Sequence, residues 1–284
     1  MTHLATPRAE VGADIQFAPA RMRRTVLEMA YAGSTVHIAC AFSIIELVTV
    51  LYRNHLRYPG NDPRAKGRDY LVLSKGHGVM AQYACMRELG WLDDSHIRGY
   101  FKDGSELKGL SDSRVPGLEV TSGSLGHGFS VGVGIAMGLL RNGTDQKVYA
   151  IVGDGELNEG AIWEGALVAA HHRIDNLMLI VDKNGFQAMG TTDDVLALGD
   201  LLAKFASFGF EMLEVDGHDE AAVDAAIRHL WMTGAGKPKA LIARTVKGKG
   251  VAFMESDNRW HYTRLNSQTF AEAVDALGLL GASK

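Results

Sequence analysis

Short apolar runs alternate along the chain with longer segments in which apolar and polar residues are mixed. Runs such as Leu177–Val181 are continuously apolar, as expected of strands that are covered on both faces. Alternating strands and helices imply an α/β fold, with a parallel sheet sandwiched by helices. We predict strands over residues 69–74, 147–152, 177–181, 211–215 and 240–243, and helices over 19–33, from 43, and over 78–89, 127–140, 158–173, 199–207 and 219–233.

Residues with strong capping preferences set several of the predicted helix ends. Pro19 suits a first helical turn, and Gly33 and Gly90 suit the ends of helices. Ser43-Ile-Ile-Glu46 has the Ser-x-x-Glu pattern of a capping box. We therefore predict that the second helix begins at Ser43.

The chain is predicted to form one domain. Its 284 residues are 46% hydrophobic, which is enough for a sizeable core. No repeat and no Ser/Pro-rich linker divides the sequence. We expect a single domain over residues 1–284, with residues 1–18 as an N-terminal extension.

Charge and cysteine content argue against several classes of protein. Lys and Arg total 29 and Asp and Glu 33, whereas a general nucleic-acid or membrane-surface binder would need a basic excess. The uncharged stretch Val120–Leu140 is rich in glycine and serine, unlike a uniformly apolar membrane span. Two cysteines, and no apolar run in the first twenty residues, are consistent with a reducing, cytoplasmic location.

Glycine is over-represented, with 33 glycines against 6 prolines. This balance suggests an ordered protein whose backbone must come close to something. A P-loop is not expected, because the sequence has no Gly-x-x-x-x-Gly-Lys-Ser/Thr. The glycine strings at 126–132 and 132–138 miss the dinucleotide-binding fingerprint by one residue.

Two polar residues follow neighbouring predicted strands. Asp154 comes directly after the strand that ends at Val152, and Asn184, thirty residues later, follows the strand that ends at Val181. This distance is about one strand–helix–strand unit, and a right-handed crossover places both loops at the carboxyl edge of the sheet. The beginning of the next helix, at Asn158, would lie beside them and favour a phosphate.

An Asp carboxylate, an Asn carbonyl oxygen and one backbone carbonyl make a set of three hard oxygens. Mg²⁺ prefers six such ligands and usually takes the rest from phosphates and water. The inferred ligand is a magnesium-bound diphosphate. The alternative is that Gly-Asp-Gly and Asn-Gly are ordinary turns, as most such peptides are; the spacing and the preceding apolar strands favour the metal site.

These residues resemble the thiamine diphosphate motif, and their flanks resemble the transketolase family. The resemblance runs in family order from about Arg21 to Asn266. Its motifs are Gly153-Asp-Gly155 with Asn184, Ser74-Lys-Gly-His-Gly78, Gly123-Ser-Leu-Gly-His-Gly128, Gly155-Glu-Leu-Asn-Glu-Gly160, Thr245-Val-Lys-Gly-Lys-Gly250 and Trp260-His261. It implies the thiamine diphosphate-binding (PP-type) fold.

Single-chain members of this family are more than twice as long and add a pyrimidine-binding domain and a carboxyl-terminal domain. The chain therefore resembles the amino-terminal subunit of a split transketolase. The resemblance implies a partner subunit that carries the pyrimidine-binding domain, in an α2β2 assembly with the cofactor site at the interface.

The resemblance also implies roles for particular residues. Asp154, Asn184 and the backbone carbonyl of Phe186 would hold Mg²⁺ (or Mn²⁺ or Ca²⁺) on the diphosphate. Lys247 would contact a phosphate, unless it is a solvated loop lysine. Glu159 would reach across the interface, unless it is an ordinary acid at a helix N-terminus. The remaining residues expected to bind the cofactor are His77, Gly123, Leu125 and Gly155.

Histidines at three family positions would line the substrate channel. By resemblance, His37 would orient the substrate, and His77 and His261 would assist proton transfer, since histidine shuttles protons near neutral pH. Lys75, beside His77, would assist in substrate binding. For each histidine the alternative is an ordinary core residue with satisfied hydrogen bonds.

The chain departs from the family pattern at several positions. Leu110 stands where a histidine is usual, Ile38-Ala39 replaces Pro-Gly, and Tyr262 follows His261 where a glycine is usual. These departures place the ordinary pentose-phosphate substrates in doubt and favour a specialised sugar pathway. His127, where glutamine is common, is a hypothetical substrate-binding replacement for the missing histidine.

The activity that the resemblance implies is transfer of a two-carbon ketol unit from a ketose (phosphate) to an aldose (phosphate), as a glycolaldehyde transferase of class EC 2.2.1.-. Three alternatives stay open: a 2-oxo acid decarboxylating subunit like an E1 α chain, a noncatalytic subunit that retains the fold, and, last, a nicotinamide oxidoreductase. The channel histidines argue against the first alternative, and intact Asp154, Asn184 and His261 argue against the second.

Overall fold

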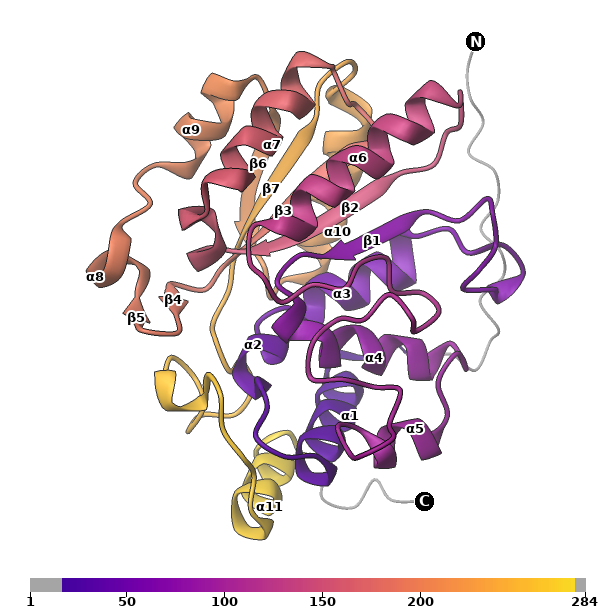
Figure 1. Ribbon diagram of the computed structural model, residues 1–284. Coiled ribbons are helices and arrows are strands. Elements are labelled where there is room, and N and C mark those ends of the chain that lie inside the picture. Colours follow the sequence, from indigo (N-terminus) through magenta and orange to yellow (C-terminus); the bar gives the residue numbers. More distant parts are fainter. Residues whose placement is uncertain (1–16, 279–284) are drawn as a thin grey trace.

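The sheet consists of five parallel strands in the order β1-β2-β3-β7-β6 (Figure 1). These strands are β1 (Tyr70–Leu73), β2 (Val148–Gly153), β3 (Leu177–Lys183), β6 (Glu211–Asp216) and β7 (Lys239–Arg244). The computed structural model describes residues 17–278. All five predicted strands are present, and the predicted α/β fold with a parallel sheet between helices is confirmed.

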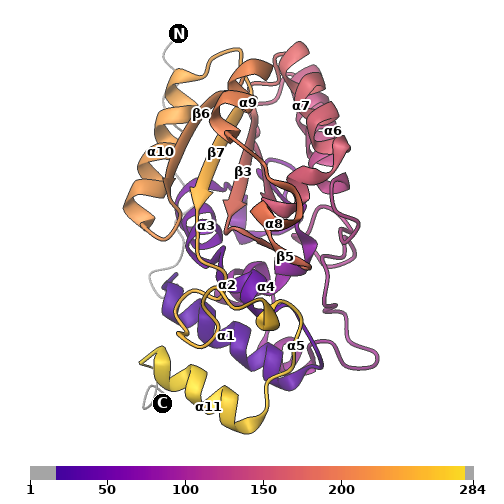
Figure 2. The same ribbon diagram turned by 90° about the vertical axis from the view of Figure 1, so that its left-hand side faces the viewer.

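Helices cover both faces of the sheet (Figure 2). Val72, Ala150 and Leu179 face α6, α7 and α9, whereas Tyr149 and Ile151 face the opposite helical layer, which includes α10. This alternation explains the continuous apolar runs, because successive side chains of one strand enter different cores. These helices are α6 (His127–Arg141), α7 (Gly160–His171), α9 (Leu201–Phe208) and α10 (Glu220–Thr233).

A further group of helices lies beyond the carboxyl ends of the strands (Figures 1 and 2). It consists of α1 (Pro19–Ala32), α2 (Ile38–Phe42), α4 (Val79–Glu88), α5 (Asp94–Gly99) and α11 (Ser267–Ala276), with α3 (Ile45–Val50) reaching towards α10. The loops that follow β1, β2, β3 and β7 are therefore enclosed between the sheet edge and these helices.

Several short elements were not expected from the sequence. They are α2, α5, α8 (Thr192–Leu196), α11 and a small antiparallel hairpin of β4 (Phe186–Gln187) and β5 (Gly190–Thr191). The helix predicted over 158–173 is shorter than expected, because a 3-10 turn, Gly155–Asn158, precedes α7. All of them except α11 are too short for a periodic pattern to identify them, whereas α11 has ten residues and is a helix that the sequence analysis missed.

The predicted capping box at Ser43 is wrong. The helix begins at Ile45 with Ile44 in the capping position and no side-chain hydrogen bond there. The Ser43 hydroxyl instead donates to Asp182 Oδ2 at 2.8 Å, and the Glu46 carboxylate accepts from Arg23 Nη1 at 2.7 Å. Partners distant in the sequence have taken both side chains away from the helix end.

Two further predictions concern the ends of the chain and the membrane. That the chain forms a single domain stays a prediction. Residues 1–16 of the expected N-terminal extension lie outside the described residues. Between residues 17 and 278, no helix combines the length and the apolar character needed to cross a bilayer. The uncharged stretch 120–140 contributes Phe129, Val133 and Ala136 to the core beside the sheet.

Candidate functional site

The loops that follow β2 and β3 meet at the carboxyl edge of the sheet. Gly153 is paired with Asp182 in the ladder, so the next residues of both strands emerge side by side. The backbone N–H of Gly185 donates to Asp154 Oδ2 at 2.5 Å, and that of Gly155 donates to Oδ1 at 2.8 Å. Asp154 and Asn184 therefore lie in adjacent loops, as their thirty-residue spacing predicts.

Asp154 is a buried carboxyl group in an unfavourable place for negative charge. Burial, and next the nearby Asp182 carboxylate, raise the pKa of Asp154 to about 7. A cation at this point would favour the ionised form, because an adjacent opposite charge offsets the cost of burial. The chemistry of the site therefore suits a bound cation.

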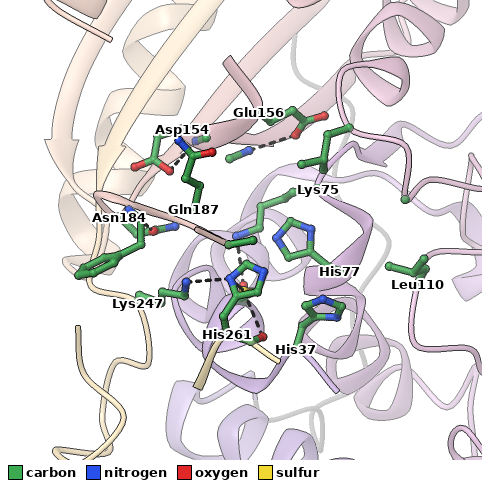
Figure 3. A pocket seen from close by; sticks show the side chains of 17 residues that line it. His37, Lys75, His77, Leu110, Asp154, Glu156, Asn184, Gln187, Lys247 and His261 are labelled. Atoms are coloured by element: carbon green, nitrogen blue, oxygen red, sulfur yellow. Dashed lines mark hydrogen bonds between the residues drawn. The ribbon is translucent and has the colours of Figure 1, made fainter. Parts of the chain in front are cut away.

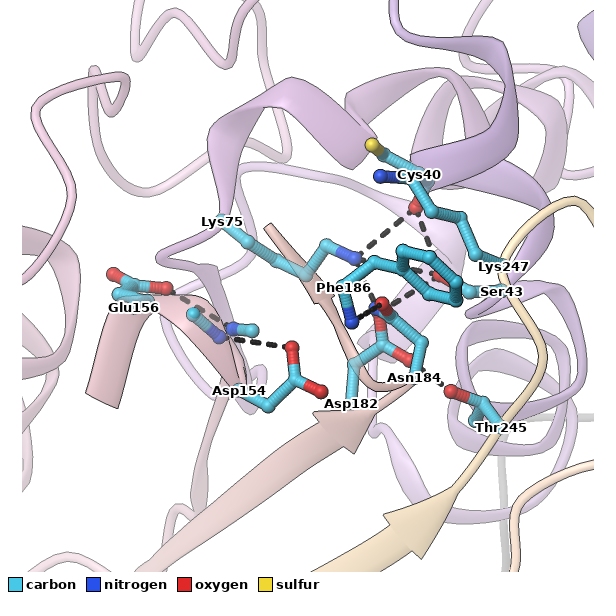
Figure 4. Close-up of polar contacts among 12 residues, drawn as sticks. Cys40, Ser43, Lys75, Asp154, Glu156, Asp182, Asn184, Phe186, Thr245 and Lys247 are labelled. Carbon is cyan, nitrogen blue, oxygen red and sulfur yellow. Dashed lines mark hydrogen bonds and ion pairs between the residues drawn. The ribbon is translucent and has the colours of Figure 1, made fainter. Parts of the chain in front are cut away.

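The second oxygen donor is held in a fixed orientation. Asn184 Nδ2 donates to Asp182 Oδ2 at 2.9 Å, and Asn184 Oδ1 accepts from the Phe186 N–H at 3.1 Å (Figure 4). A carbonyl oxygen has two lone pairs, so Oδ1 retains one for a further partner.

Among residues 17–278 no group of three His, Cys, Asp or Glu side chains could hold a metal. A carboxylate, an amide and a backbone carbonyl fit Mg²⁺, which takes its other oxygens from phosphate and water.

A buried ion pair lies directly beneath these loops (Figure 4). The Lys75 ammonium contacts the Asp182 carboxylate and donates to the Cys40 carbonyl at 3.1 Å. The hydroxyls of Ser43 and Thr245 also donate to Asp182. Burial alone would raise the pKa of Asp182, but Lys75 and these hydrogen bonds hold it below its usual value. Lys75 thus supports the cavity wall, with its charge directed to Asp182.

Glu156 is a second buried acid that sequence reasoning missed. Its carboxylate accepts from the Ser74 hydroxyl at 2.5 Å and from the N–H groups of Gly126 and Gly153 at 2.9 and 3.2 Å. Burial raises its pKa. It joins three loops of the site. The sequence did offer one signal for this buried acid, namely a charged residue directly after Asp154-Gly155.

These loops enclose a cavity of about 320 Å³ (Figure 3). Eleven of its lining residues are predicted site residues, and the structure adds Cys40, Leu110, Gly153, Glu156, Gln187 and Ala188. The predicted ones are His37, Lys75, His77, Gly123, Leu125, Asp154, Gly155, Asn184, Phe186, Lys247 and His261. The cavity is of the size usual for small-molecule sites.

Three histidines stand together on one side of the cavity. The ring centroid of His37 lies 5.3 Å from that of His77 and 5.4 Å from that of His261, and those of His77 and His261 are 5.9 Å apart. Burial and the charges of Lys247 and Lys75 lower the pKa of His37 to about 4; burial, Lys247 and His37 lower that of His261 to about 3. Burial and Lys75 also hold the pKa of His77 well below its usual value. All three rings are therefore neutral near pH 7.

Lys247 orients one of these rings. Its ammonium lies 2.8 Å from His261 Nδ1 and donates to Asn258 Oδ1 at 2.6 Å. Because an ammonium group can only donate, Nδ1 accepts, and the neutral ring carries its proton on Nε2. Burial lowers the pKa of Lys247.

The turn after Lys247 requires glycine, since Gly248 has φ +80° and a Cβ there would lie 2.3 Å from the Met254 carbonyl oxygen.

The predicted glycines allow close packing by the protein's own side chains. A Cβ on Gly123 would lie 2.7 Å from Leu110 Cδ1, and a Cβ on Gly155 would lie 2.7 Å from Gln187 Cβ. Leu110 and Gln187 therefore reach the cavity only because these positions have no side chain.

Two predicted site residues lie outside the cavity lining. Glu159 is exposed at the N-terminal end of α7 and its side chain makes no capping hydrogen bond. His127 is exposed, with Nδ1 3.2 Å from the Leu125 carbonyl oxygen. Leu110 lines the cavity and His127 does not, so this geometry gives no support to the hypothesis that His127 replaces the missing histidine.

Comparison with known proteins places the chain in a family. A family described as "Transketolase, thiamine diphosphate binding domain" matches residues 21–283. The chain is 36% identical over 252 residues to a subunit of the apulose-4-phosphate transketolase of Phocaeicola vulgatus, with 89% of each chain covered. It is 33% identical over 270 residues to the 6-deoxy-6-sulfo-D-fructose transketolase subunit SqwG of a Clostridium species, covering 95% of this chain and 98% of that one.

A solved structure shares the fold. A transketolase variant from Pichia stipitis, in complex with fructose 6-phosphate, superposes with a TM-score of 0.85 at 25% identity. The match covers 92% of this chain but only 40% of the Pichia chain. Together with the family match and the arrangement of Asp154, Asn184 and the three histidines, these similarities show that the chain belongs to the transketolase family, in which it corresponds to the thiamine diphosphate-binding domain.

Proposed function

We propose that this chain is the cofactor-binding subunit of a two-component transketolase, which transfers a two-carbon ketol unit from a ketose (phosphate) to an aldose (phosphate) in the cytoplasm. The coverage supports this assignment, since the chain matches 89% of the Phocaeicola protein, which is named as one subunit of its enzyme, but 40% of a transketolase solved as a longer chain. The remainder of the site would belong to a partner subunit that carries the pyrimidine-binding domain, in an α2β2 assembly.

The cofactor would be held at the edge of the sheet. Asp154, Asn184 and the Phe186 carbonyl would bind Mg²⁺ on the diphosphate of thiamine diphosphate, and Lys247 would contact a phosphate oxygen. Bound there, thiamine diphosphate supplies a nucleophilic carbon and an electron sink for cleavage of a carbon–carbon bond. Exposed Glu159 is free of any capping bond and would meet the partner subunit.

The histidines would handle the substrate. His37 would hold a sugar hydroxyl, His77 would move the proton of the reacting hydroxyl, and His261 would assist this transfer by donating a hydrogen bond from Nε2. A neutral ring can accept a proton on one nitrogen while it donates from the other. Because Lys247 occupies Nδ1 of His261, its Nε2–H is the side available to the substrate. The enclosing walls would exclude water from the reacting carbon.

One observation carries the proposal: Asp154 and Asn184 lie in one cavity with three neutral histidines. The test is calorimetry with thiamine diphosphate and Mg²⁺ on the chain combined with its partner subunit. Asp154→Asn removes the charge at nearly constant size, and we expect a loss of at least about 100-fold in Mg²⁺-dependent affinity. Asp193→Asn, on the surface of α8, is the matched control. Unchanged affinity in Asp154→Asn would overturn the proposed site.

A further inference from the structure

A second cavity of about 270 Å³, here called the outer pocket, adjoins the site cavity and shares His37 and Leu110 with it. Its other lining residues are Thr35, Val36, Phe101, Lys108, Gly109 and Tyr262. In Figure 3, Leu110 and His37 lie on the side of the site cavity away from Asp154 and Asn184. A ligand that reaches past the histidines from the metal end would therefore enter the outer pocket.

The walls of the outer pocket are formed by large apolar and aromatic side chains that do not belong to the core. Phe101, Leu110 and Tyr262 are 39%, 41% and 54% exposed; the first two come from the loop between α5 and α6, and Tyr262 from the segment before α11. Exposed apolar groups that converge on one hollow mark a binding surface more often than scattered ones do. Buried Val36 completes the apolar lining.

The outer pocket is held in shape by the backbone. Val36 and Thr263 form an antiparallel bridge with N–H to carbonyl distances of 2.8 and 3.1 Å, and the adjoining rings of His37 and Tyr262 contact each other, tilted by 43° with 4.6 Å between centroids. Phe101 has φ +56°, an unfavourable value for a bulky residue, and its N–H donates to the Leu107 carbonyl at 3.1 Å. Such strain persists where the surroundings fix the conformation, and often at functional sites.

Packing keeps the Phe101 ring in place as well. A Cβ on Gly109 would lie 3.1 Å from Phe101 Cε2, so the ring rests directly on the glycine backbone. The loop that carries Leu110 is tied to the site, because the Ser111 N–H donates to the Gly76 carbonyl at 3.2 Å. The shape is thus formed before a ligand arrives, which lowers the entropic cost of binding.

Few polar groups face a ligand in the outer pocket. Of its eight lining residues Lys108 alone is formally charged at neutral pH, since the pKa of His37 is lowered, and the Lys108 ammonium donates to the Ser105 carbonyl at 2.7 Å. A sugar hydroxyl that left water for the wall formed by Leu110, Val36 and Phe101 would lose hydrogen bonds without replacement. A carbon segment with few hydroxyls would lose few such hydrogen bonds.

We propose, on the basis of the function above, that the outer pocket binds the carbon chain of the acceptor aldehyde and selects chains that carry few hydroxyl groups. Leu110, Phe101 and Tyr262 are its specificity-determining residues. The aldehyde carbon accepts the two-carbon unit beside the histidines, and the rest of the acceptor passes through the reaction unchanged against the apolar wall.

The test compares two acceptors with hydroxypyruvate as the donor, using the chain loaded with thiamine diphosphate and Mg²⁺ and combined with its partner subunit. Butanal carries an apolar chain and glycolaldehyde a hydroxyl. In Leu110→His we expect the butanal-to-glycolaldehyde ratio of kcat/KM to fall at least about 10-fold, the scale on which hydrophobic pockets discriminate. Met232→His, on exposed α10 outside both cavities, is the matched control and leaves the ratio unchanged.

A binding measurement tests the pocket without turnover. Saturation-transfer NMR with 1-butanol on the chain alone should show transfer to the methyl group that is weaker in Leu110→His and in the surface variant Tyr262→Ala, but not in Met232→His. An unchanged ratio, or equal transfer in all variants, overturns the outer pocket as an apolar subsite. Absence of ketol transfer to either acceptor overturns the proposed function instead, while the NMR result still decides on the pocket.

Discussion

Replacement of Lys75, whose ammonium group is buried beneath the site, tests the charge balance on which the loop geometry depends. Lys75 is 1% exposed and Asp182 is fully buried, and they form an ion pair. In Lys75→Met the carboxylate keeps its hydrogen bonds from Ser43, Thr245 and Asn184 but loses the only ammonium that contacts it within the described chain. Removal of one partner from a buried pair costs about 3–5 kcal/mol, a large part of the roughly 5–15 kcal/mol that stabilises a domain.

The pH dependence of this loss has a definite sign. In the wild type the pKa of Asp182 is lowered on folding, so its contribution is present above the unfolded pKa and disappears as the pH falls through the folded one. In Lys75→Met burial dominates and the pKa of Asp182 rises above its usual value. The folded variant then binds this proton more tightly than the unfolded chain, so the contribution of Asp182 to the stability of the variant increases as the pH falls from 7 towards 4.

Urea unfolding of the cofactor-free chain at several pH values measures both effects. The difference in free energy of unfolding between wild type and Lys75→Met should be largest at neutral pH and shrink in acid. Lys75→Met with Asp182→Asn removes both charges and should be more stable than Lys75→Met alone. A difference below about 1 kcal/mol at pH 7, or one that does not change with pH, would refute the reasoning.

Three further predictions concern the same cavity. In histidine-resolved NMR titrations, His37 and His261 should stay neutral well below pH 6.5, because their pKa values in the folded chain are about 4 and 3. The unfolded chain then binds more protons below pH 6.5, so these two residues should lower the stability of the fold as the pH falls. Titration midpoints near 6.5 for these two residues would contradict this. Gly248→Ala should lower the melting temperature more than Gly209→Ala, since both positions have positive φ but only Gly248 has a close neighbour; equal losses would remove the steric argument. Glu156→Gln should lower the free energy of unfolding, measured with a chemical denaturant, by about 1–3 kcal/mol, because the amide NH₂ would face a backbone N–H donor. An unchanged free energy of unfolding would show that the three loops do not depend on Glu156.

The parts of the site that lie one supersecondary unit apart could be predicted from the sequence. The apolar runs before Asp154 and Asn184 identify parallel strands, and adjacent parallel strands place their carboxyl ends at one edge. In the structure the last residues of the two predicted strands, Val152 and Val181, are paired with each other. Which residues approach the glycines could not be predicted, since Leu110 and Gln187 reach Gly123 and Gly155 through loops without periodic structure.

The support beneath the site could not be predicted, because its contacts are distant in sequence. Ser43 and Asp182 are 139 residues apart, and Lys75 and Asp182 are 107 apart. Ser43 has the local features of a helix cap, and only the folded chain shows that Asp182 is a stronger competitor for its hydroxyl. Sequence patterns report local preference, and a buried acid can override that preference because leaving it without donors costs more than leaving a helix end uncapped.

The two lysines of the cavity have opposite partners, and this explains how one small space can hold both ionised and neutral groups. The Lys75 charge is matched by Asp182, which leaves Asp154 without a cation of its own and suits it to an external one. The charge of Lys247 lies against His261, where it keeps the ring neutral instead of forming an ion pair. From the sheet edge outward the cavity therefore changes from anionic oxygens to neutral imidazoles, and then to the apolar wall at Leu110. We expect a substrate bound along this axis to place its reacting carbonyl at the imidazoles, because a neutral imidazole has one ring nitrogen that donates a hydrogen bond and one that accepts it.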